Sequence, residues 1–136
     1  MGHEPVIVLD THVLVWWVSG SGRLSIRAKR AIDQGLRRSP AIVSTVSVLE
    51  IATAVRRGRL ELQSPLAQWL TDLRALPELQ FQLVSAEIAE LAGSFDETTP
   101  GDPADRIIIA TALILRAKLV TADERLRESP IVVTVW

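Results

Sequence analysis

Five acidic side chains of this sequence stand beside short apolar segments, where the chain is expected to change direction. They are Asp10, Glu50, Asp102, Asp105 and Asp123. Carboxylates gathered in one cleft repel one another, which drives one or more of them towards the neutral form. A divalent cation removes that repulsion, and Mg²⁺ or Mn²⁺ prefers oxygen ligands of this kind. Such an ion can polarise a phosphodiester and lower the pKa of a water nucleophile, which is the chemistry of phosphodiester hydrolysis.

Each acid also has an ordinary structural explanation when it is taken alone. Asp10 and Asp123 could cap the helices that follow them. Ser47 and Glu50 have the spacing of a capping box, in which Glu50 would reach back to the backbone. The segment 102–105 reads Asp-Pro-Ala-Asp, which is typical of a helix start. The prediction of a functional site therefore depends on the acids meeting at one place.

Other kinds of catalytic site have few candidate residues here. The chain has no cysteine, which excludes disulfides, thiolate catalysis and cysteine-based zinc sites. Its two histidines, His3 and His12, do not resemble a zinc site. His12 lies close to Asp10, but at a helix start we expect a core or capping residue rather than a catalytic one.

Short apolar segments that alternate with helical ones must position the acids. We expect strands at 6–9, 42–43, 81–84, 119–121 and 131–135. We expect helices at 13–18, 25–36 and 47–57, from Pro65 to a stop at Pro77, at 86–95, from Asp102-Pro103 through Lys118, and at 124–127. This alternation indicates an α/β fold with a short parallel sheet covered on both faces. Since sites in such sheets lie at the carboxyl ends of the strands, the fold would bring the acids to one edge.

The composition is that of an ordinary folded domain, which we expect to span 1–136. Hydrophobic residues make up 48% of the chain and charged residues 23%. The N-terminal residues show no signal peptide, and Asp10 interrupts the first apolar run too early for a membrane span. Together with the lack of cysteine, these features favour a cytoplasmic protein without membrane contact.

The net charge of −1 does not indicate a nucleic-acid partner. Binding of nucleic acid would have to use local basic groups, although solvated helix faces are the more common explanation for such groups. The basic groups are Arg27, Lys29, Arg30, Arg37 and Arg38, and separately Arg56, Arg57 and Arg59. We expect Trp16 and Trp17 to serve the core and an interface rather than to stack on bases.

Four segments carry a family resemblance that covers nearly the whole chain. The segments resemble, in order and spacing, the motifs of the PIN-domain family and in particular of its VapC-type toxins. They are VIVLDTH (6–12), STVSVLEI (44–51), DPADRIIIATA (102–112) and LVTAD (119–123). The resemblance implies a PIN-like three-layer fold and Mg²⁺- or Mn²⁺-dependent endoribonuclease activity on RNA. It also implies a homodimer and a small VapB-like, DNA-binding antitoxin, which would place a basic side chain in the acidic cleft.

The resemblance also implies roles for individual residues. The catalytic quartet would be Asp10, Glu50, Asp105 and Asp123. The three aspartates of this quartet would hold the metal ion, and Glu50 would complete the cage or orient the attacking water. Asp102 would be an accessory acid, three residues before Asp105 on the same helix face. Thr121 would supply a hydroxyl that orients ligands or water.

One position departs from the family pattern. Relatives often carry histidine two residues before the first Asp of the Asp-Pro-x-Asp-Arg motif, and this sequence has Pro100 there. We interpret the change as subfamily variation without a histidine role at that rim. Arg106 of the motif is expected to make a structural ion pair rather than a phosphate contact. The dimer or antitoxin interface is expected near Trp16, Trp17 or Trp69, because the first helix is too apolar to lie exposed.

Other functions can be weighed against the same residues. Phosphoacceptor α/β domains need a lysine on a late strand, and the final strand here has none. Haloacid-dehalogenase-like phosphatases need a second Asp two residues after the first, where this sequence has His12. A non-catalytic PIN-like module that binds RNA or a protein would be expected to lose acids, whereas this sequence keeps all four. A free-standing nuclease without an antitoxin stays a further alternative.

Overall fold

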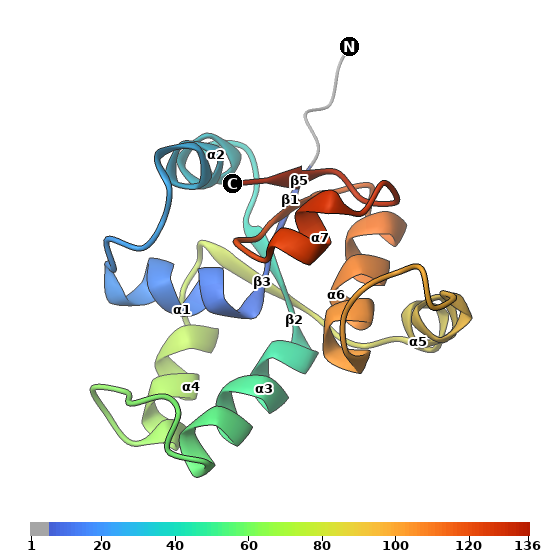
Figure 1. Ribbon diagram of the computed structural model, residues 1–136. Coiled ribbons are helices and arrows are strands. Elements are labelled where there is room, and N and C mark those ends of the chain that lie inside the picture. The colour runs from blue at the N-terminus through green and yellow to red at the C-terminus, as the bar shows by residue number, and fades with distance from the viewer. Residues whose placement is uncertain (1–5) are drawn as a thin grey trace.

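The computed structural model describes residues 6–136, which form one parallel sheet covered by helices (Figure 1). Residues 1–5, which include His3 and the stretch in which we expect no signal peptide, lie outside the described residues. The strands of the described chain are β1 (Ile7–Leu9), β2 (Ala41–Ser44), β3 (Leu79–Gln82), β4 (Lys118–Val120) and β5 (Thr134–Val135). They pair in the order β3-β2-β1-β4-β5, all parallel. The α/β fold class predicted from the sequence is confirmed.

Successive side chains of the central strands enter two separate cores, one on each face of the sheet. Ile7 and Leu9 of β1 belong to the first core, and Val8 between them belongs to the second. In β4, Leu119 packs into the second core and Val120 into the first. Since side chains of a strand alternate between faces, two buried faces require an unbroken apolar run in the sequence.

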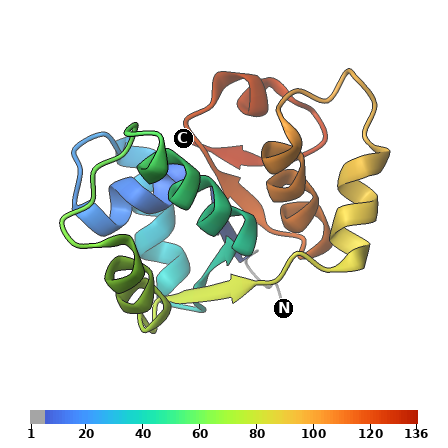
Figure 2. The same cartoon turned by 90° about the horizontal axis from the view of Figure 1, so that it is seen from below.

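The helices form a layer on each face of the sheet. They are α1 (Thr11–Ser19), α2 (Ile26–Leu36), α3 (Thr45–Arg56), α4 (Leu66–Arg74), α5 (Ala86–Ser94), α6 (Pro103–Ile114) and α7 (Glu124–Glu128). Figure 2 shows α1 to α4 on one side, and α6 with α5 packed outside it on the other. None of the helices in residues 6–136 has the length and apolarity that crossing a membrane requires.

Several predicted helix ends are shifted by two or more residues, and the shifts at α3 and α6 have identified causes. α3 begins at Thr45, two residues early, because the side chain of Ser44 accepts a hydrogen bond from the backbone N–H of Val46 and caps the helix. α6 ends at Ile114, so the chain does not stay helical through Lys118. The stop is a turn in which Arg116 has a φ of +52°, a conformation that usually calls for glycine.

The outer strands also differ from the prediction. β3 begins two residues earlier than expected and stops at Gln82, and the predicted strand 131–135 is reduced to the two residues of β5. Residues 130–132 form a turn and bend instead, although the β-branched run reads as a strand. Both strands lie at sheet edges, where one neighbour is missing and the pattern alone does not fix the strand length.

Candidate active site

Asp10 is buried directly after β1, at the carboxyl edge of the sheet. Its Oδ1 accepts a hydrogen bond of 2.8 Å from the backbone N–H of Thr11, which caps α1 as predicted. Its Oδ2 accepts a hydrogen bond of 2.7 Å from the hydroxyl of Thr121, just after β4. Burial raises the pKa of Asp10 above its usual value, and these two hydrogen bonds oppose part of that shift.

Glu50 reaches the same edge from the second turn of α3. Its Oε1 accepts a hydrogen bond from the hydroxyl of Thr11, and that hydroxyl lies 2.8 Å from the hydroxyl of Ser47. Since a threonine hydroxyl has one proton, and it goes to Glu50, Ser47 is the donor in the second contact. The capping box that the spacing of Ser47 and Glu50 would allow is not the arrangement in the structure. The helix begins at Thr45, so both side chains lie within it and contact the start of α1.

Asp102 and Asp105 hold each other at the start of α6. Oδ1 of Asp102 accepts from the backbone N–H of Asp105 at 2.9 Å, and Oδ2 of Asp105 accepts from the backbone N–H of Asp102 at 3.2 Å. The predicted helix start is confirmed, with Asp102 as its N-cap. Gly101 precedes it with a φ of +103°, and a Cβ at this residue would lie 2.6 Å from the Cβ of Asp105. Glycine is therefore required where the chain approaches Asp105.

Three of these carboxylates form a close group that fits a metal ion. Glu50, Asp102 and Asp105 each offer an oxygen, and the three oxygens lie within 4.8 Å of one another. Burial raises the pKa of Asp105 to about 6, and the negative charges of Asp102, Asp10 and Glu50 add to the shift. Burial is also the main reason that the pKa of Glu50 lies above its usual value. A set of oxygen donors with mutually repelling charges suits a hard divalent cation.

Asp123 lies at this edge with a counter-ion of its own. It caps α7, where Oδ1 accepts from the backbone N–H of Arg125 at 2.9 Å and Oδ2 from its guanidinium at 3.1 Å. Burial raises the pKa of Asp123, but the hydrogen bonds and charge of Arg125 outweigh this, and the net pKa is lowered. The same guanidinium is 3.8 Å from Oδ2 of Asp105. Asp123 stands outside the group of three carboxylates, with Arg125 between it and Asp105.

All the predicted site residues thus come to one edge of the sheet. The set is Asp10, Glu50, Asp102, Asp105, Thr121 and Asp123. Thr11, Ser47 and Arg125 also belong to the site, although the sequence did not predict them there. The sequence pattern suggests only helix-capping roles for Thr11 and Ser47. The ion pair of Asp123 and Arg125 could have been predicted, because the two residues are two positions apart at the start of a helix.

Two neighbouring residues differ from their predicted roles. His12 is exposed rather than a core residue or a cap, and its ring lies 5.9 Å from that of Trp16. Arg106 is structural, as expected, but its guanidinium donates to three backbone carbonyls of the loop 95–99 rather than to a carboxylate. These contacts anchor the loop that leads into α6.

The comparisons with known proteins agree with this architecture. The family model of the PIN domain matches residues 7–131 of this chain. The chain belongs to the PIN-domain family. Ribonuclease VapC22 of Mycobacterium tuberculosis is 36% identical over 132 residues, which cover 96% of this chain and 98% of that protein.

Solved structures of similar proteins share the fold. A VapBC2 complex from Rickettsia felis, bound to a DNA fragment from its promoter, matches with a TM-score of 0.69 and 15% identity, over 95% of this chain and 96% of that one. A toxin–antitoxin complex from Klebsiella pneumoniae matches with a TM-score of 0.61 and 23% identity, over 94% and 96%. The predicted PIN-like fold of a short parallel sheet flanked by helices is confirmed.

Proposed function

We propose that this protein is a Mg²⁺- or Mn²⁺-dependent endoribonuclease and the toxin of a VapC-type toxin–antitoxin pair. The observation that carries the proposal is the close group of Glu50, Asp102 and Asp105 beside the buried Asp10. Its donor set suits the cations that hydrolytic phosphodiester chemistry uses. The 36% identity to a protein named as a ribonuclease supports the same activity.

In the proposed mechanism, carboxylates hold the metal ion and neighbouring polar groups hold the carboxylates. The family resemblance gives Asp10, Asp105 and Asp123 as its ligands, whereas the close group joins Asp105 to Glu50 and Asp102 and leaves Asp123 paired with Arg125. Asp105 would be the ligand common to both sets. When bound, the ion would supply charge for the phosphoryl oxygens and a lowered pKa for the attacking water. Glu50, whose pKa burial raises above its usual value, would orient that water and accept its proton.

We also propose the partners that the family resemblance implies. Similar solved structures are toxin–antitoxin complexes, which supports a VapB-like antitoxin and a homodimer for this chain. Trp16, Trp17 and Trp69 line one cavity of about 920 Å³ between α1 and α4, a suitable surface for such an interface. We further propose that 1–136 is a single PIN domain acting in the cytoplasm.

Cleavage of RNA by the purified protein tests this function. We expect cleavage with Mn²⁺ or Mg²⁺, none with EDTA, and recovery when excess metal is added. Asp105→Asn should be inactive, whereas Asp33→Asn, which changes an exposed carboxylate on α2, should retain activity. Binding of RNA without cleavage in either metal would favour the non-catalytic module. Cleavage and growth inhibition that no cognate antitoxin relieves would favour a free-standing nuclease.

A further inference from the structure

A groove of about 710 Å³ leads from the carboxylates along α1 and α3. Glu50 and Asp102 line its wall in one part, and Arg57 and Arg59 line it beyond the end of α3. Arg57 is the C-cap of α3 and lies seven positions after Glu50, which corresponds to about 10 Å along the helix axis. The groove therefore has an acidic part at the proposed reaction site and a basic part about 10 Å away from it along α3.

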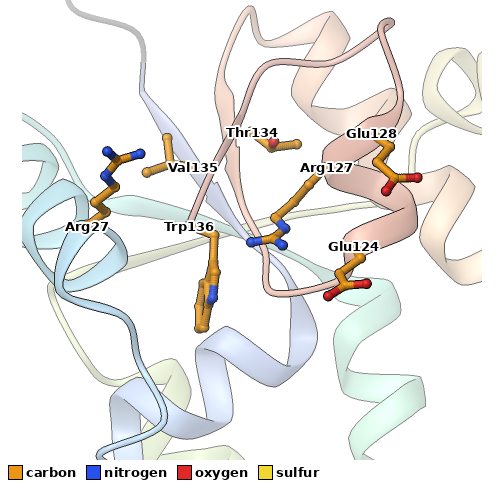
Figure 3. A pocket seen from close by; sticks show the side chains of 7 residues that line it. All are labelled: Arg27, Glu124, Arg127, Glu128, Thr134, Val135 and Trp136. Atoms are coloured by element: carbon orange, nitrogen blue, oxygen red, sulfur yellow. The ribbon is translucent and has the colours of Figure 1, made fainter.

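Trp16 supplies an aromatic surface in this groove. Trp16 is half-buried, and its ring lies 5.9 Å from the ring of His12 and 5.9 Å from the ring of Trp136. His12 lines the same groove as Glu50. Figure 3 shows Trp136 extending from the C-terminal strand towards α1. The guanidinium of Arg23 lies 5.9 Å from the Trp16 ring. Neighbours on several sides fix the orientation of Trp16 while part of the ring stays accessible.

The charge of the groove suits a phosphate backbone. Arg23, Arg57 and Arg59 are all exposed and all line it, while its carboxylates belong to the reaction site. A smaller cavity of about 540 Å³ beside α7 and β5 offers a contrast (Figure 3). There Arg27 and Arg127 are matched by two glutamates, so that cavity offers no excess of positive charge.

We propose that Trp16 and three arginines of this groove contact a single-stranded RNA substrate, with one base stacked on Trp16 and adjacent phosphates on Arg23, Arg57 and Arg59. Trp16 lines both this groove and the cavity that it shares with Trp17 and Trp69, and we assign it to RNA in place of the interface role expected from the sequence. The inference rests on the proposed function, since it places the substrate beside the carboxylates that would cut it. Stacking on an aromatic side chain requires an unpaired base, which favours single strands over duplexes. The guanidinium groups contact the backbone, so the binding is expected to tolerate many sequences. Exposed apolar side chains such as Leu49, 65% exposed, line the groove between these contacts.

RNA binding by Asp10→Asn protein, in EDTA, measures the groove separately from catalysis. The probe is a fluorescently labelled single-stranded RNA of about a dozen nucleotides, with the same sequence as a duplex for comparison. Trp16→Leu should weaken binding about tenfold, and Trp16→Phe should restore most of it, because a ring at this residue is what the base requires. The Arg57→Gln/Arg59→Gln pair should lower the slope of log K against log salt by about 0.7 for each phosphate that the variant no longer neutralises.

A matched control and a second probe make the result decisive. Lys118→Gln removes an exposed charge at the opposite edge of the sheet and should leave RNA binding unchanged. RNA should also quench tryptophan fluorescence in the wild-type groove and quench it less in Trp16→Phe. Since Arg57 and Arg59 are exposed beyond the end of a helix, their double variant is expected to fold even if Trp16→Leu does not.

The outcomes separate this inference from the proposed nuclease activity. Equal RNA affinity and salt slope in wild type and both groove variants would overturn the inference, whether or not the protein cleaves RNA. Loss of antitoxin binding with unchanged RNA binding would assign the groove to the protein partner and would also overturn it. Groove-dependent RNA binding without metal-dependent cleavage would support the groove and contradict the nuclease proposal.

Discussion

The hydroxyl of Thr121 donates a hydrogen bond of 2.7 Å to Oδ2 of Asp10, although the two residues lie 111 positions apart in the chain. The bond joins the ends of β1 and β4, whose register places Leu9 beside Val120. The pairing of the two central strands therefore fixes the orientation of the buried carboxylate of the site.

Thr121→Val should reduce both stability and RNA cleavage. The substitution keeps the shape of the side chain but removes the donor to Oδ2 of the buried Asp10 and the acceptor for the backbone N–H of Asp123, at a cost of about 1–3 kcal/mol. Urea unfolding and the cleavage rate measure the two effects. Thr111→Val is the matched control, because the Thr111 hydroxyl is also buried but donates only to the carbonyl of Ile107 within α6. Equal losses of activity in the two variants would contradict a role for the bond at the site.

Gly101→Ala should impair cleavage although it alters no polar group. The added Cβ would meet the Cβ of Asp105 at 2.6 Å, on a backbone with a positive φ, and would displace that carboxylate. Gly93→Ala on α5 meets nothing within 4 Å, and it should stabilise the protein by about 0.5–1 kcal/mol without affecting cleavage. Steady-state rates and melting curves of both variants check the prediction, which full activity of Gly101→Ala would refute.

The metal-free protein should become more stable as the pH falls from 7.5 to 5.5. With its pKa at about 6, Asp105 takes up a proton in the folded state over this range, whereas in the unfolded chain it stays ionised to about pH 4. Asp10 and Glu50 act in the same direction, since both pKa values are raised. Asp123 has a lowered pKa, so its stabilising contribution is lost only at more acidic pH. Melting curves in EDTA measure the effect.

Asp105→Asn serves as the control for this pH dependence. It should raise the melting temperature at pH 7.5 in EDTA, because it removes one of the repelling charges, and it should flatten the dependence on pH. With Mn²⁺ present, the wild-type protein should gain more stability at pH 7.5 than at pH 5.5, since protons compete with the metal. A metal-free wild-type protein that is less stable at pH 5.5 would contradict the assigned charges.

Arg125→Gln should tighten Mn²⁺ binding about two- to threefold. The guanidinium bonds Asp123 and lies 3.8 Å from Asp105, so it competes with a cation for the same carboxylates. The effect is small because the Arg125 side chain is 64% exposed and water screens its charge. Calorimetric titration of the RNA-free protein measures it, and Arg127→Gln on the same helix is the control. Weaker Mn²⁺ binding by Arg125→Gln would show that the arginine positions Asp123 for the metal instead.

The sequence predicts the sheet and the convergence of the acids because these depend on patterns that are local. An apolar run such as 6–9 specifies a strand buried on both faces, and parallel strands end at a common edge. The contact of Thr11 with Glu50 was not predictable, since it depends on how α1 packs against α3. The end of α6 was not predictable either, because no residue type in the sequence indicates it. The helix ends at a turn in which Arg116 has a positive φ, where a glycine would have been the usual sequence indication.

The central claim is that one metal-dependent site cuts RNA, and the rate of cleavage by single and double variants tests it most directly. Asp10→Asn, Glu50→Gln, Asp105→Asn and Asp123→Asn should each abolish Mn²⁺-dependent cleavage in proteins that remain folded. Since the four side chains would act as one unit, Asp10→Asn/Asp105→Asn should be little worse than either single variant. Near wild-type cleavage by any one single variant would remove that residue from the site. Cleavage by the wild type that persists in EDTA would contradict the account.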